Sequence, residues 1–177
     1  MKRDFLGDSY NAVKRLWQQV FAEWAPLYAE PRFIPEELRE DFIRLTRVPM
    51  RGAEQMRPYS ILNDPDTGVR LPDEANQAGG RTHITLDTIA EQLRESDVRC
   101  VVTFDQSDYR HSELKRDQQR QKKMAHLINS RCFAFYYVSH APFLFAFPDL
   151  DMQQQVQARL GDFGIPEERL EFAATNA

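Results

Sequence analysis

The chain has few cysteines, little surplus charge of either sign and no long apolar run, and each shortage excludes a class of protein. Only two of its 177 residues are cysteines, which excludes a small domain held by disulfides. Its 23 basic and 27 acidic side chains leave a net charge of −4, which excludes a strongly basic, histone-like binder. With 42% hydrophobic residues it is too apolar to be wholly disordered. We therefore expect one folded domain.

No segment has the pattern of a membrane span or a secretory signal. The most apolar stretch, Cys132–Phe147, is interrupted by Ser139, His140 and Pro142, and it is shorter than the roughly 20 apolar residues of a spanning helix. The first ten residues carry charges of both signs and no apolar core. These features predict a cytoplasmic protein that makes no contact with a membrane.

The N-terminal part of the chain has the pattern of two helices. Apolar residues recur at steps of three and four from Val13 to about Trp24, where Pro26 ends the pattern. Pro35 and the acidic residues after it predict the start of a second helix, which ends before Pro49.

A long loop rich in proline and glycine, residues 48–81, follows these helices. Inside it, Tyr59–Leu62 and Val69–Leu71 flank the turn-forming residues Asn63–Gly68, and this pattern predicts a small hairpin. After the loop, Thr85 as a candidate N-cap and Leu86, Ile89 and Leu93 at helical spacing predict a third helix. Residues 1–97 are therefore predicted to be a helical region interrupted by the loop.

From Val98 onward the pattern changes to strand, helix, strand, strand, helix, strand. This order is the split βαβ arrangement of ferredoxin-like folds, an α+β class. It predicts an antiparallel sheet with the spatial order fourth, first, third, second and with both helices on one face. Residues 98–174 would form this region and pack with residues 1–97 as one domain. The predicted elements are Val98–Phe104, Ser112–Asn129, Phe133–Ser139, Phe143–Phe147, Asp151–Phe163 and Leu170–Ala174.

The predicted sheet is apolar on both faces. In the third strand, Phe143 and Phe145 alternate with Leu144 and Ala146, so each face carries apolar side chains. A sheet of this kind must be covered on both sides. The N-terminal helices are the expected cover of the second face, and a second copy of the chain is the competing one.

Polar residues gather where the first two strands of the ferredoxin-like region end. In a split βαβ sheet these carboxyl ends meet at one edge, about two strand spacings of 4.8 Å apart. Side chains from both could therefore meet on one ligand. The candidate catalytic residues are Asp105, Asp108, His111 and His140, and the candidate ligand-binding residues are Ser107, Tyr109, Arg110 and Ser139.

One interpretation of this edge is a metal-dependent phosphodiesterase or nuclease. Asp105 and Asp108 would bind Mg²⁺ or Mn²⁺ or act as general base, and Arg110 with the helix start would hold an anion. An aspartate at the end of the first strand, followed by a helix start that bears an arginine, is similar to the small CRISPR-associated endonucleases of this fold. No zinc-ligand spacing, nucleophile motif or phosphate-binding loop adds to it, so no cofactor is predicted otherwise. The alternative is that these residues simply cap the helix.

A second interpretation is RNA binding. Residues 107–131 carry seven basic against three acidic side chains. Phe145–Phe147 is similar to the aromatic core of the RNA-recognition motif, and this resemblance implies an open sheet face on which bases stack. The competing interpretation, which we favour, places these phenylalanines in the core.

A third interpretation, a binding or regulatory module that contacts a protein partner or a second copy of itself, is the one we predict. The catalytic constellation is incomplete, the net charge is acidic and the long loop is typical of binding proteins. Nucleic acid is a less favoured partner.

Overall fold

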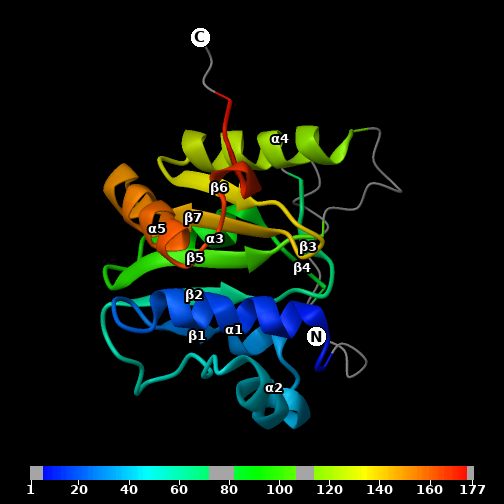
Figure 1. Cartoon of the computed structure of the whole chain (residues 1–177), viewed down its shortest axis with the longest axis vertical. Coiled ribbons are helices and arrows are strands. Elements are labelled where there is room, and N and C mark those ends of the chain that lie inside the picture. The colour runs from blue at the N-terminus through cyan, green and yellow to red at the C-terminus, as the bar shows by residue number, and fades with distance from the viewer. Residues whose placement is uncertain (1–5, 72–81, 107–113, 175–177) are drawn as a thin grey trace.

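A six-stranded mixed sheet forms the middle of the molecule, and helices cover both of its faces (Figure 1). The structure is a computed structural model that describes residues 6–71, 82–106 and 114–174. A second sheet pairs β3 (Gly68–Val69) with β4 (His83–Ile84) in parallel. In their spatial order, the strands of the large sheet are β1 (Leu27–Ala29), β2 (Tyr59–Asn63), β5 (Val98–Phe104), β7 (Phe143–Phe147), β6 (Phe133–Tyr137) and β8 (Leu170–Phe172).

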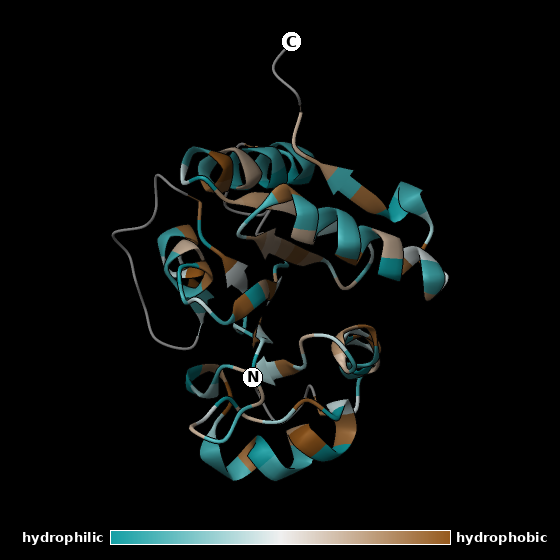
Figure 2. Ribbon diagram, turned by 90° about the vertical axis from the view of Figure 1, so that its left-hand side faces the viewer, coloured by the Kyte–Doolittle hydropathy of each residue, from teal (hydrophilic) through white to brown (hydrophobic). Residues whose placement is uncertain are grey.

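The helices lie in two layers. Helices α1 and α5 lie on one face of the sheet and α3 and α4 on the other, as the two perpendicular views show (Figures 1 and 2). Helix α2 packs beside α1 at the β1 end of the sheet (Figure 1). No helix in the described ranges is long and apolar enough to cross a membrane. The helices are α1 (Ser9–Phe21), α2 (Arg39–Thr46), α3 (Leu86–Leu93), α4 (Arg116–Asn129) and α5 (Leu150–Asp162), with 3-10 turns at Pro31–Phe33, Glu36–Leu38 and Glu167–Arg169.

Local sequence signals set several of these boundaries. The side chains of Asp8, Thr85 and Asp149 each accept a hydrogen bond from a backbone N–H of the first turn of α1, α3 and α5. Thr85 is the predicted cap, and the strands Val98–Phe104 and Phe143–Phe147 have the predicted bounds. The other elements predicted after residue 98 form with shifted ends.

Aromatic rings fill the space between the sheet and α1. The Trp17 ring meets the Phe143 and Phe145 rings edge-on at centroid distances of 5.9 and 5.2 Å. Phe145 also stacks on Phe135 at 5.1 Å, and none of these four rings is exposed. Helix α1 therefore covers this face of the sheet together with α5, and the phenylalanines lie in the core as predicted.

The predicted ferredoxin-like strand order is wrong at its edges. The first three strands of that region do lie in the predicted order, β5-β7-β6. The last strand, however, pairs with β6 instead of β5, because β2 occupies the place beside β5 in parallel pairing. The sheet is consequently mixed instead of antiparallel, with β1, β2 and β5 parallel.

The different edge also explains why α5 lies opposite α4. The crossovers from β5 to β6 and from β7 to β8 move in the same direction across the sheet. They start from strands that run in opposite directions. Right-handed crossovers must then place their helices on opposite faces, whereas the predicted order would have placed both on one face.

The predicted hairpin between Tyr59–Leu62 and Val69–Leu71 is wrong as well. Strand β2 is buried along its whole length and pairs with β1 and β5, whereas β3 pairs with β4. A fully buried parallel strand is a short apolar run, which sequence periodicity does not separate from a hairpin arm. The turn residues instead carry the chain over the end of β5, where the Gln106 N–H donates to the Thr67 carbonyl oxygen at 3.1 Å.

Replacing Phe145 tests the core. Phe145→Ala removes a fully buried ring that packs against Trp17 and Phe135, so the free energy of unfolding should fall by about 3–5 kcal/mol in urea denaturation. Phe163→Ala, at a ring that is 42% exposed, is the matched control and should change it by less than about 1 kcal/mol. Equal effects of the two variants would contradict the placement of Phe145.

Candidate functional site

The carboxylate of Asp105, directly after β5, is buried and fully used. Its Oδ2 accepts hydrogen bonds from Lys123 Nζ and Tyr136 Oη, both at 2.7 Å, and its Oδ1 accepts one from the Val69 N–H at 2.9 Å. The residue is 1% exposed. Asp105 therefore connects the end of β5 to α4, β6 and β3, and its role is structural.

The charge of Lys123 decides the ionisation of this group. Burial alone raises the pKa of Asp105, but the positive charge and hydrogen bond of Lys123, with the hydrogen bonds from Tyr136 and Val69, outweigh it and hold the pKa below its ordinary value. Burial and the adjacent Asp105 charge raise the pKa of Tyr136 well above its ordinary value. The phenol therefore stays protonated and donates to Asp105 at neutral pH.

The close packing of the backbone against Asp105 also requires a glycine at position 68. Gly68 has φ +140°, and a Cβ added there would lie 2.3 Å from the Asp105 carboxylate oxygen. Only glycine combines this conformation with so close an approach. The glycine therefore lets the start of β3 pack directly on the Asp105 carboxylate.

The predicted site residues have different outcomes. The Asp105 N–H donates to the Pro142 carbonyl oxygen at 3.1 Å, so the end of β5 does meet the connection between β6 and β7. The structure does not bring the Asp105 and His140 side chains together, because Asp105 points to α4 and the exposed His140 pairs with Ser9 Oγ before α1 at 3.1 Å. The predicted residues Ser107, Asp108, Tyr109, Arg110 and His111 lie outside the described residues.

Ser139 is used within its own turn. Its Oγ donates to the Ala141 carbonyl oxygen at 2.9 Å and accepts from the Ala141 N–H at 3.0 Å. This geometry stabilises the connection before β7. A ligand-binding role of Ser139 stays a prediction.

A metal centre stays a prediction too. Within residues 6–71, 82–106 and 114–174, no three His, Cys, Asp or Glu side chains lie close enough together to hold a metal ion. Asp108 and His111, which the metal hypothesis includes, are outside these ranges. Of the two carboxylates in that hypothesis, the structure describes Asp105 alone. This carboxylate already forms an ion pair with Lys123.

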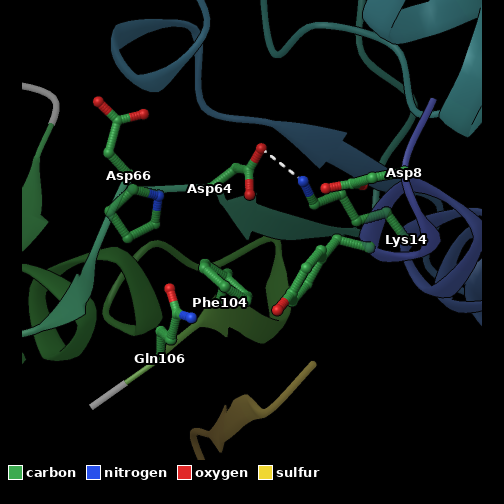
Figure 3. Close-up of a pocket in the computed structure, with 8 residues that line it drawn as sticks. Asp8, Lys14, Asp64, Asp66, Phe104 and Gln106 are labelled. Atoms are coloured by element: carbon green, nitrogen blue, oxygen red, sulfur yellow. Dashed lines mark hydrogen bonds and ion pairs between the residues drawn. The ribbon is translucent and has the colours of Figure 1, made fainter. Parts of the chain in front are cut away.

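A pocket of about 180 Å³ opens on the other face of the sheet at the same edge. Its walls come from the start of α1, from the segment that follows β2 and from the end of β5 (Figure 3). In open α/β sheets, ligands bind outside the carboxyl ends of the parallel strands, which is where this pocket lies. The lining residues are Asp8, Tyr10, Lys14, Asp64, Pro65, Asp66, Phe104 and Gln106.

A second buried lysine–aspartate pair forms one wall of this pocket. Lys14 Nζ donates to Asp64 Oδ2 at 2.7 Å, and each side chain is 5% exposed (Figure 3). The Lys14 ammonium also lies 5.8 Å from the centre of the Phe42 ring and 6.0 Å from that of Phe104. The site thus combines buried ionised groups with aromatic walls.

Sequence patterns alone did not single out Lys14, Asp64, Tyr10 or Phe104 as site residues. One signal was present: Lys14 lies on the buried stripe of α1 with Trp17 and Phe21, where a charged side chain needs a buried partner. The partner is 50 residues away in the chain, and no local pattern connects the two. Lys123 is likewise a charged residue among the buried residues of α4.

No protein-family model, curated protein or solved structure matches this chain. Its function must therefore be inferred from the geometry of the site.

The pH dependence of stability tests the Asp105 pair. Asp105→Asn removes the carboxylate with which the buried Lys123 pairs, so we expect a loss of about 3–5 kcal/mol in the free energy of unfolding at pH 7. Because the folded pKa of Asp105 is lowered, its contribution is present above the unfolded value of about 3.9 and is lost as pH falls through the folded pKa. The gap between wild type and variant should therefore narrow below about pH 4.

Urea denaturation at steps from pH 7 to pH 3 measures this gap. Asp162→Asn, at an exposed position of α5, makes the same chemical change outside the pair and should track the wild type within about 0.5 kcal/mol. A gap that stayed constant over the whole range would show that Asp105 does not act through its charge.

Proposed function

We propose that this chain is a binding or regulatory module that holds a small ligand in the pocket at the carboxyl ends of β2 and β5. The observation that carries the proposal is the pocket itself, which three segments far apart in the chain build together. In an α/β sheet, this edge is the default place for a ligand, and convergent charged groups with aromatic walls are what a ligand site needs.

The size of the pocket limits the ligand. An apolar cavity of about 150 Å³ holds one benzene molecule. A pocket of about 180 Å³ therefore fits one small ring or a short chain with a polar group. With about eight non-hydrogen atoms, such a ligand is expected to bind in the millimolar to micromolar range.

The remaining predictions have less support from the described geometry. Phe145 and Phe147 are buried, and two basic residues of the predicted RNA-binding segment are in internal ion pairs, Arg120 with Glu171 and Lys123 with Asp105. The metal-dependent hydrolase depends on residues outside the described ranges. The exposed large apolar side chains, which a protein partner or second copy would use, are spread over several elements: Ile43, Met56, Ile128, Phe133, Leu150 and Phe163.

A cytoplasmic location is part of this proposal. Both cysteines, Cys100 and Cys132, are buried and free, and burial raises the pKa of each thiol. Free thiols are the ordinary state of cysteine in a reducing compartment.

Three probes of matched size test the pocket: benzylammonium chloride, benzyl alcohol and sodium benzoate. We expect at least one of them to shift the backbone amide signals of Tyr10, Asp64 and Gln106 in ¹H–¹⁵N NMR titrations, with saturation in the millimolar range. Gln106→Trp, which places an indole at an exposed lining position, should weaken that binding by about tenfold or more.

Gln154→Trp, at an exposed position of α5 outside the pocket lining, is the matched control and should bind like the wild type. If none of the three probes shifts these signals, or if Gln106→Trp binds as the wild type does, the pocket does not hold ligands of this size and the proposal fails.

A further inference from the structure

The two buried lysine–aspartate pairs differ in how much of the carboxylate they use. Both have a nitrogen–oxygen distance of 2.7 Å. Asp105 uses both of its oxygens, as described above. Within the described part of the chain, Asp64 Oδ1 has no hydrogen-bond partner, and it is turned from Lys14 toward the interior of the pocket (Figure 3). One pair is closed, and the other is open to a ligand.

The Lys14 ammonium is also only partly used. An ammonium group has three N–H donors. Among the described residues, Asp64 is the only acceptor within hydrogen-bond distance of Lys14. A buried ion pair with unused donors and acceptors costs stability that an apolar pair of the same volume would not. A ligand that enters the pocket can satisfy the unused oxygen.

The charges of the lining decide which sign of ligand is favoured. Lys14 is the only basic side chain among the described lining residues, and its charge already pairs with Asp64 Oδ2. Asp8 adds a second carboxylate to the lining. The aromatic side chains of the lining have faces that attract cations. The surplus of negative charge offsets the repulsion between Lys14 and a second cation.

We propose that the ligand of this pocket is a small organic cation, a primary ammonium group on an apolar or aromatic body. This inference rests on the proposed function. The ligand ammonium donates to Asp64 Oδ1, and Asp64 then bridges two ammonium groups through its two oxygens. The apolar body of the ligand lies against the Tyr10 and Phe104 rings. The site thus separates cations from neutral or anionic molecules of the same shape.

The three probes described above measure this selectivity, because they differ in charge and share one ring. In NMR or calorimetric titrations of the whole chain at constant ionic strength, benzylammonium should bind about tenfold or more tightly than benzyl alcohol, and benzoate should bind most weakly. Asp64→Asn should remove most of the preference for benzylammonium.

A second variant covers the case in which Asp64→Asn does not fold because Lys14 loses its counterion. The double variant Lys14→Met and Asp64→Asn removes both charges and leaves no unpaired ion. Its preference for benzylammonium over benzyl alcohol should fall to about twofold, because the charged hydrogen bond to Asp64 is lost and only the weaker attraction of Asp8 and the aromatic faces remains. Asp162→Asn, which removes one aspartate charge at an exposed position outside the pocket lining, should keep the full preference.

The outcomes separate this inference from the proposed function. Tighter binding of benzoate, or equal binding of all three probes to the wild type, would overturn the cation inference while the pocket remains a ligand site. An undiminished, about tenfold preference for benzylammonium in the double variant would also overturn it, because the selectivity would then come from a group other than Asp64. Absence of binding by all three would overturn the proposed function itself.

Discussion

The contact between Asp105 and Lys123 is the interaction on which the geometry of this protein most depends. It fixes α4 on the sheet through a single buried carboxylate, and the same carboxylate holds β6 through Tyr136 and β3 through the Val69 N–H. The segment between β2 and β3 carries Asp64 at its start and Gly68, packed on Asp105, at its end. The wall of the pocket is thus held from both ends, by Lys14 at one and by Asp105 at the other.

Elements with strong local signals were predictable from the sequence. In each of these elements a few adjacent residues are enough to indicate the structure. They are the helix capped by Thr85, the β-branched strand Val98–Phe104 and the aromatic strand Phe143–Phe147. The placement of β2 was not predictable in this way. Its partner β5 begins about 40 residues later, and a short apolar run between turn residues fits a hairpin arm as well as a buried parallel strand. Because β2 takes the place beside β5 that the prediction gave to the last strand, the predicted positions of β8 and α5 were wrong as well.

The candidate site was predictable in position and not in detail. The sequence indicated that the end of β5 and the β6–β7 connection meet at one edge of the sheet, and the Asp105 N–H does donate to the Pro142 carbonyl oxygen there. It did not indicate on which face each side chain would lie. With β2 and β5 in register at Leu62 and Val102, Asp64 shares a face with Phe104, whereas Asp105 lies on the other. The role of each aspartate follows from that register, which is set by contacts remote in the chain.

The two aspartates at the ends of neighbouring strands therefore serve separate purposes on opposite faces of one sheet. The contacts of Asp105 with Lys123 and Tyr136 lie on the face opposite the pocket, so substitutions at an exposed lining position such as Gln106 do not touch them. If the pocket holds a ligand as proposed, its ligand preference can be altered at such positions while the fold is kept. Diversification of the pocket and maintenance of the scaffold would then fall on different residues, which is a basis for evolvability.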